Sequence, residues 1–201
     1  MSELREEAGD IGQTLADEVW DRFEVEIESA TADGFMFDFA SSVKTVLAMS
    51  LSIAYDEAFE RHVLSCFAHL EKALRQAGLG EAEFAGAGID LAGLRKGLKL
   101  HRHADALIGQ AIERAKPGPA RILGTMLCDL VRDELEQMEA MERDMQRNAE
   151  RLKEELYALR GELMGQLAAE TTQLIKQGIQ TYRAALDALE TRPAQTVEEA
   201  A

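Results

Sequence analysis

The final third of the chain carries a nearly continuous stripe of apolar residues at helical spacing, and charged residues fill the positions between them. The apolar positions recur at steps of three and four, as in a helix that presents a seam to another helix. No proline lies between residues 120 and 192. The pattern therefore predicts a long C-terminal helix over residues 119–191, about 110 Å long at roughly 1.5 Å per residue if it is unbroken. The seam residues expected to contact another helix are Met138, Met141, Met145, Leu152, Leu156, Leu159 and Leu163.

This seam is not a regular heptad repeat. Successive steps of four residues occur twice along it, and such stutters locally unwind a left-handed supercoil. Gly161 and Gly165 lie inside the predicted helix, where each glycine costs about 1 kcal/mol relative to alanine. We therefore expect a kink or a close helix crossing near these glycines. Antiparallel packing against helices of the same chain suits this irregularity better than a long parallel dimer.

Three shorter helical segments precede the long one. The periodicity predicts helices over residues 3–29, 35–77 and 91–115. A turn at Thr31–Gly34, a glycine-rich loop at about residues 78–88 and the sequence Lys116–Pro119 separate the four segments. Pro119 is suited to the first position of the last helix. We predict an all-α fold, an antiparallel helical bundle with a long C-terminal coiled-coil-like helix.

The same pattern divides the chain into three regions. Residues 1–116 form an N-terminal helical region, and the helix over 119–191 packs on it with the option of extending beyond it as an arm. Residues 192–201 form a flexible acidic tail.

Composition and charge narrow the classes of function. The net charge of −15 argues against nucleic-acid binding and against nonspecific contact with anionic lipid, because both depend on Lys and Arg. The polar N-terminal decapeptide has no apolar segment of a secretory signal, so we expect a cytoplasmic protein. Cys66 and Cys128 lie on predicted helices beside apolar residues, where free and buried thiols are the common case.

One face of the second predicted helix carries possible metal ligands. His62, Cys66 and His69 are spaced i, i+4 and i+7, and imidazole with thiolate ligates zinc and other transition metals. However, the Glu-x-x-His pattern of di-iron bundles is absent, because Phe59 and Cys66 occupy the positions three residues before His62 and His69. We interpret the three residues as ordinary core or interface residues, with no cofactor, and keep a metal- or haem-binding bundle as an alternative.

The segment from Phe35 to Tyr55 is the most apolar part of the chain. Its uncharged core, Thr45–Tyr55, has 11 residues, whereas a membrane-spanning helix needs about 20 predominantly apolar residues. Extension back to Phe35 includes Asp38 and Lys44. A buried core helix is the favoured interpretation, and a membrane-inserting segment is the alternative.

A basic segment stands out in this acidic chain. Residues 94–103 contain two histidines, no acidic residue and the four basic side chains Arg95, Lys96, Lys99 and Arg102. We interpret them as a solvated helix face or an intramolecular partner of the acidic first helix. The alternative is a docking site for an anionic ligand or an acidic protein surface.

No arrangement of nucleophile and base is recognisable in the sequence. We therefore expect a non-enzymatic helical scaffold or assembly protein that acts through self-association and contacts with other helical proteins.

Overall fold

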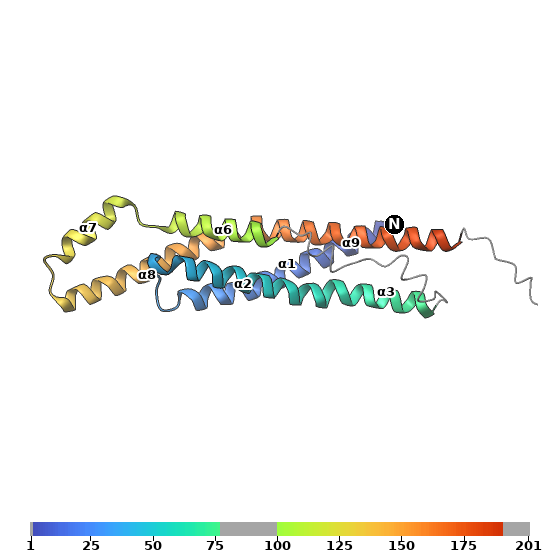
Figure 1. Ribbon diagram of the computed structural model, residues 1–201, viewed down its shortest axis with the longest axis horizontal. Coiled ribbons are helices and arrows are strands. Elements are labelled where there is room, and N and C mark those ends of the chain that lie inside the picture. Colours follow the sequence, from blue (N-terminus) through green and yellow to red (C-terminus); the bar gives the residue numbers. More distant parts are fainter. Residues whose placement is uncertain (1, 77–99, 191–201) are drawn as a thin grey trace, which may run out of the picture.

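The computed structural model describes residues 2–76 and 100–190 (Figure 1), and these residues form an all-α antiparallel bundle without strands. The predicted all-α helical bundle is confirmed, whereas the coiled-coil character of its C-terminal part stays a prediction. The principal helices are α1 (Ser2–Thr31), α2 (Ala40–Phe59), α3 (Ser65–Gln76), α6 (Leu100–Ala115), α7 (Pro119–Asp129), α8 (Glu134–Ala158) and α9 (Arg160–Glu190).

Helix α1 is the central helix of the bundle, because it packs against both α9 and α2. Its apolar residues recur every three or four positions, so they share one face. That face is fully buried and includes Leu15, Val19, Trp20, Phe23 and Ile27. The rings of Trp20 and Phe23 meet edge to face at 5.8 Å, and Arg160 of α9 lies over the Trp20 ring.

Two glycines allow close approaches in this part of the bundle. A Cβ atom on Gly12 would lie 2.7 Å from the carbonyl oxygen of Ala168, so only glycine lets α1 and α9 come this close. Gly34 ends the turn after α1 with a φ of +86°, a conformation that favours glycine. The next residue, Phe35, donates a backbone hydrogen bond of 2.9 Å to the carbonyl of Met145 and so ties this turn to α8.

The second predicted helix is a nearly continuous helical segment. It begins with a 3₁₀ turn, η1 (Phe37–Phe39), and contains a π-helical turn, η2 (Glu60–Leu64), between α2 and α3. Helix α2 buries Leu47, Leu51 and Tyr55, as expected for a core helix. Its opposite face leaves Val46, Met49 and Ile53 exposed, so the apolar segment is only half covered.

The expectation of one continuous helix over residues 119–191 is wrong. The chain turns at residues 130–133 and is interrupted again at Leu159, so three helices replace one. The Asp133 side chain caps α8 by accepting a hydrogen bond of 2.9 Å from the backbone N–H of Glu136. The side-chain amide of Gln137 donates to the carbonyls of Asp129 and Arg132, at 2.7 and 3.0 Å. These bonds satisfy the turn and stop the helix without a proline or glycine.

The predicted irregularity near Gly161 takes a different form. Helical hydrogen bonding is interrupted at Leu159, two residues earlier. A Cβ atom on Gly161 or Gly165 would meet no described atom of a neighbouring segment within 4 Å, so neither glycine marks a close crossing. The close approaches of α9 occur instead at Gly12 of α1 and at Gly178, which lies against the Phe67 ring of α3.

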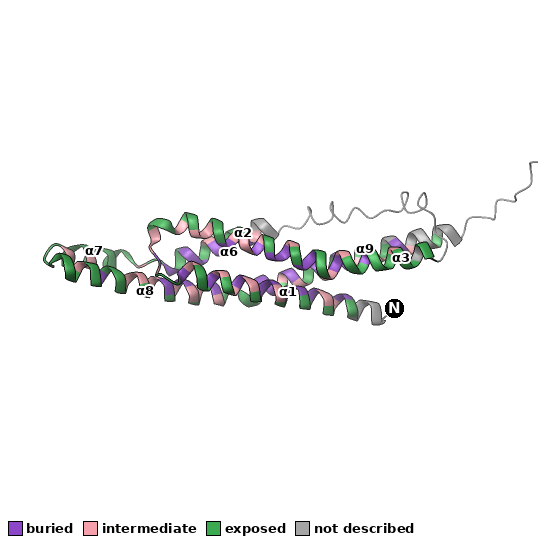
Figure 2. Ribbon diagram, turned by 90° about the horizontal axis from the view of Figure 1, so that it is seen from below, coloured by how far each residue is buried: buried purple, intermediate pink, exposed green. Residues whose placement is uncertain are grey.

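The molecule is elongated, and one end differs from the rest. Helix α7 and the first part of α8 project beyond the bundle (Figure 1). Burial is concentrated along α1, α2, α6, α9 and the second half of α8, whereas α7 is almost entirely exposed (Figure 2).

Candidate protein-contact site

The projecting part of the chain, residues 119–148, forms a helical hairpin that we call the contact hairpin. None of the eleven residues of α7 is buried. An isolated helix of this length is marginal in water, because most helical stability in proteins comes from packing of an apolar face. The large apolar side chains exposed on the contact hairpin are Ile122, Leu123, Met126, Leu127, Leu130, Val131, Leu135, Met138 and Met141.

Polar contacts hold α7 beside α8. The Arg121 guanidinium lies 3.1 Å from the Asp144 carboxylate, and this ion pair joins the two helices directly. The capping and Gln137 hydrogen bonds described above fix the turn between them. These contacts orient α7 but cover little of its apolar surface.

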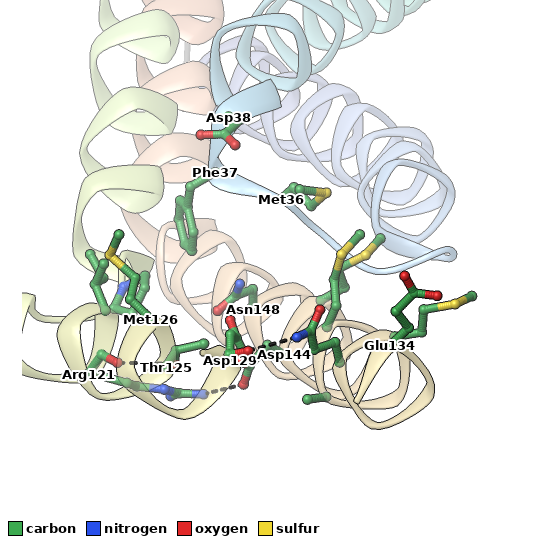
Figure 3. A pocket seen from close by; sticks show the side chains of 17 residues that line it. Met36, Phe37, Asp38, Arg121, Thr125, Met126, Asp129, Glu134, Asp144 and Asn148 are labelled. Atoms are coloured by element: carbon green, nitrogen blue, oxygen red, sulfur yellow. Dashed lines mark hydrogen bonds and ion pairs between the residues drawn. The ribbon is translucent and has the colours of Figure 1, made fainter. Parts of the chain in front are cut away.

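A cleft of about 740 Å³ lies between α7, α8 and the segment around η1 (Figure 3). Figure 3 shows the Phe37 side chain pointing toward the space between the two helices, with Met126 on one side. The lining is mainly apolar and unusually rich in thioethers. Its principal apolar side chains are Met36, Phe37, Met126, Met138, Met141 and Met145.

The charged residues of the cleft are mostly acidic. Asp38, Asp129, Glu134 and Asp144 line it, and Arg121 is the basic residue among the described lining residues. Arg121 is already paired with Asp144. The cleft therefore combines an apolar floor with a negatively charged rim.

A second apolar surface lies on the other side of α7. Leu123, Leu127 and Leu130 are spaced i, i+4 and i+7, and none of them lines the cleft. We call these three residues the outer face of α7. Leu130 is 81% exposed, and Val131 beside it in the turn is 86% exposed. The chain from Ile122 to Cys128 contains no charged residue, so the face is uncharged around Leu123 and Leu127. Beside Leu130, the charge of Asp129 is paired with that of Arg132.

The structure separates the predicted seam residues into two groups. Met138 and Met141 are exposed on the contact hairpin, and Met145 is half-buried in the floor of the cleft. The other seam residues are in the core of the same chain, so they are not available to a partner, contrary to expectation: Leu152, Leu156, Leu159 and Leu163. The reason is tertiary packing, because α1, α6 and α9 cover the seam beyond residue 148.

The suggested metal ligands have separate partners. The ring nitrogen Nε2 of His62 lies 2.7 Å from the Glu18 carboxylate, and Nδ1 of His69 lies 2.7 Å from the carbonyl oxygen of Ser65. The hydrogen bond with His62 lowers the pKa of Glu18, and the nearby Arg61 adds to this effect against the opposing effect of burial. Within residues 2–76 and 100–190, no group of three His, Cys, Asp or Glu residues is arranged to hold a metal ion.

The two cysteines differ from the expectation. Cys66 and Cys128 are both free, but both are exposed rather than buried. Each lies on a helix face turned away from the core, which apolar neighbours in the sequence do not reveal.

The basic segment lies largely outside the described residues. This applies to Arg95, Lys96 and Lys99, and to the side chain of Arg102, whose backbone belongs to α6. The glycine-rich loop and the acidic tail also lie outside the described residues.

The apolar segment suggested to touch a membrane is part of a longer helical stretch. By length and composition alone, Phe37–Ala73 could cross a membrane, with a mean hydropathy of 1.2 in its most apolar window. Only 17% of that window is buried in the bundle, which agrees with the exposed stripe on α2.

Sequence reasoning missed the cleft and the outer face of α7, because both depend on the turn at residues 130–133. The uncharged run from Ile122 to Cys128 was the available signal for the outer face.

Comparison of the chain with known protein families, with curated proteins and with solved structures finds no match in any of the three.

Proposed function

We propose that this chain is a non-enzymatic helical assembly protein that self-associates through the outer face of α7. The observation that carries the proposal is a helix of eleven residues with none of them buried, although it bears several large apolar side chains. A second copy of the same helix would cover these side chains. The bundle then serves as a rigid body that presents the contact hairpin at one end.

Energy and charge both support this pairing. Complete burial of one leucine side chain contributes about 1.5–3 kcal/mol, so Leu123, Leu127 and Leu130 together provide a substantial driving force. The whole chain has a net charge of −15, which opposes association at a distance. Because the outer face itself is neutral, two copies can meet there without placing like charges in contact. Gly124 lies in open space and leaves room for a close helix approach.

Sedimentation velocity over a tenfold concentration series tests the proposal. We expect a concentration-dependent oligomer for the wild type and at least tenfold weaker association for Leu127→Gln combined with Leu130→Gln. Val25→Gln is the matched control, because Val25 is an exposed apolar residue on α1. A monomer at every concentration, or equal weakening by the control, would overturn the proposal.

Cys128 offers an independent test, because it is an exposed thiol next to Leu127. In a Cys66→Ser background, a short bismaleimide should join two chains through Cys128. Leu127→Gln should abolish this cross-link. A chain that keeps only Cys66, with Cys128→Ser, is the control and should give little cross-linked dimer.

As a second candidate function, we propose membrane contact through the exposed stripe Val46, Met49 and Ile53 of α2. The length and hydropathy of Phe37–Ala73 support it. Flotation with uncharged phosphatidylcholine vesicles should recover the wild type and lose Met49→Asp. Leu47→Asp is unsuitable, because Leu47 is fully buried and its replacement would disturb the bundle. Failure of the wild type to float removes this candidate.

A further inference from the structure

We propose that the cleft of the contact hairpin binds the apolar face of a basic amphipathic helix from a different protein. This inference rests on the proposed function, since both assign protein contacts to the contact hairpin. It adds a second surface and a partner of defined chemistry. The outer face of α7 would join copies of this chain, and the cleft on the other side of the same helix would recruit the partner.

The shape of the cleft suits a helix. Its walls are two helices, α7 and α8, and the segment Met36–Asp38 borders it (Figure 3). The volume of about 740 Å³ is that of a binding cleft rather than a packing defect. Amphipathic helices bind in grooves of this kind through apolar residues spaced i, i+3, i+4 and i+7.

The side chains of the floor suit a protein partner. Met36, Met126, Met138, Met141 and Met145 are unbranched thioethers, which adapt to irregular apolar surfaces. Met138 and Met141 are 69% and 54% exposed, so the surface is open to a partner. A set of flexible methionines can repack around leucines or aromatic residues of an incoming helix.

The acidic residues of the cleft indicate that the partner helix is basic. Asp38 and Glu134 line the cleft together with Asp129 and Asp144, which already engage Arg132 and Arg121. The whole contact hairpin contains seven acidic and four basic residues. An identical hairpin would bring like charges together in this cleft, and an anionic membrane would be repelled. Lys and Arg residues beside the apolar face of a partner helix would complement the rim.

Fluorescence anisotropy with a synthetic peptide tests the inference. The probe is a labelled helix of about five turns (roughly 18 residues), with leucines at i, i+3, i+4 and i+7 and lysines beside them. Its matched control carries glutamate in place of every lysine. We expect micromolar binding of the basic peptide and at least tenfold weaker binding of the acidic one. No binding of the basic peptide, or equal binding of both, would overturn the inference.

Variants of the protein locate the site. Met141→Gln in the floor and Glu134→Lys on the rim should each weaken peptide binding at least fivefold. Asp21→Lys changes the charge by the same amount at an exposed position of α1 and should leave binding unchanged. An equal effect of Asp21→Lys would mean nonspecific attraction to the acidic chain and would contradict the inference.

The two proposals fail separately. Leu127→Gln with Leu130→Gln should remove self-association and leave peptide binding intact. Glu134→Lys should weaken peptide binding and leave self-association intact. Peptide binding by a chain that never self-associates would refute the proposed self-association alone. A peptide of this chain's own residues 89–103 is a further probe. Tighter binding of this peptide than of the designed one would make the chain's own basic segment the occupant and overturn the assignment to a different protein.

Discussion

Gly12 sets how closely the two longest helices of the bundle approach. The carbonyl oxygen of Ala168 lies 2.7 Å from the position that a Cβ atom on Gly12 would occupy, and the Thr172 side chain is also in contact with it. Thr172 donates a hydrogen bond of 3.2 Å to the carbonyl of Ala8, one turn earlier on α1. The helix crossing therefore depends on a missing side chain and on a polar contact beside it.

This crossing predicts opposite effects of two similar substitutions. Gly12→Ala should destabilise the protein by about 1–2 kcal/mol, because overpacking against a backbone carbonyl exceeds the gain in helix propensity. Gly9→Ala on the same helix should stabilise it by about 0.5–1 kcal/mol, because its Cβ meets no described atom within 4 Å. Urea unfolding of both variants measures the difference. Equal effects would show that α1 and α9 do not meet at Gly12.

Glu18 predicts a pH dependence of stability. Its hydrogen bond with His62 lowers its pKa in the folded state, so the folded protein binds the proton more weakly than the unfolded chain. The resulting stabilisation is complete above the unfolded pKa of about 4.3 and disappears as the pH falls through the folded pKa. Glu18→Gln should therefore cost about 1 kcal/mol near neutral pH, a value reduced by solvent screening because the carboxylate is partly exposed.

Unfolding free energies at a series of pH values between neutrality and acid test this expectation. The difference in unfolding free energy between wild type and Glu18→Gln should shrink as the pH falls below the pKa of the free carboxyl group. Asp21→Asn, an exposed position on the same helix, is the control for a general effect of charge. A constant difference at all pH values would contradict the assigned role of Glu18.

At the scale of elements, the sequence predicted helices well and their ends poorly. Apolar periodicity located α1 and the α2–α3 segment within a few residues, because a helix must bury one face. The turn at residues 130–133 was not predicted, because in the sequence Asp133 and Gln137 look like solvated helix residues. Only in three dimensions do their side chains bond to the backbone of the turn.

The same limit applied to the candidate site. Met138 and Leu152 belong to one sequence pattern, yet Met138 is exposed and Leu152 is in the core. Periodicity indicates that one helix face must be covered, but it does not indicate which segment covers it. In the structure, α1, α6 and α9 cover the seam of α8, and they extend along α8 only beyond the contact hairpin.

The cap of α8 gives a prediction at this scale. Asp133→Ala should remove the hydrogen bond to the backbone of Glu136 and cost about 1 kcal/mol. Because α7 contributes no buried residue to the bundle, the loss should remain local. Hydrogen exchange of amides in residues 119–140 should accelerate about fivefold, with almost no change in α1 or α9. Glu139→Ala, exposed on the same helix, is the control. Faster exchange throughout the bundle would contradict the prediction that loss of the cap destabilises only the contact hairpin.

At the scale of the whole molecule, the bundle and the contact hairpin have different physical characters. The bundle buries its large apolar side chains between helices and is tied on its surface by ion pairs between helices, such as Lys44 with Asp105 at 2.9 Å. The contact hairpin is oriented mainly by polar contacts and leaves its apolar side chains exposed. A rigid body that presents an unsatisfied apolar surface at one end is the arrangement expected of an assembly component.

Salt should affect the two proposed contacts in opposite directions. Self-association brings together two chains of net charge −15 through a neutral face, so screening of their repulsion should strengthen it. Binding of a basic helix depends on attraction to Asp38 and Glu134, so the same screening should weaken it. Between about 50 and 300 mM NaCl the Debye length falls from roughly 14 Å to roughly 6 Å, which is less than the width of a helix. Over this range self-association should tighten and peptide affinity should fall by roughly threefold to tenfold. Sedimentation and anisotropy in the same buffers measure both. If both contacts weaken with salt, the neutral outer face of α7 is not the surface that joins the copies, because only attraction between opposite charges is lost on screening.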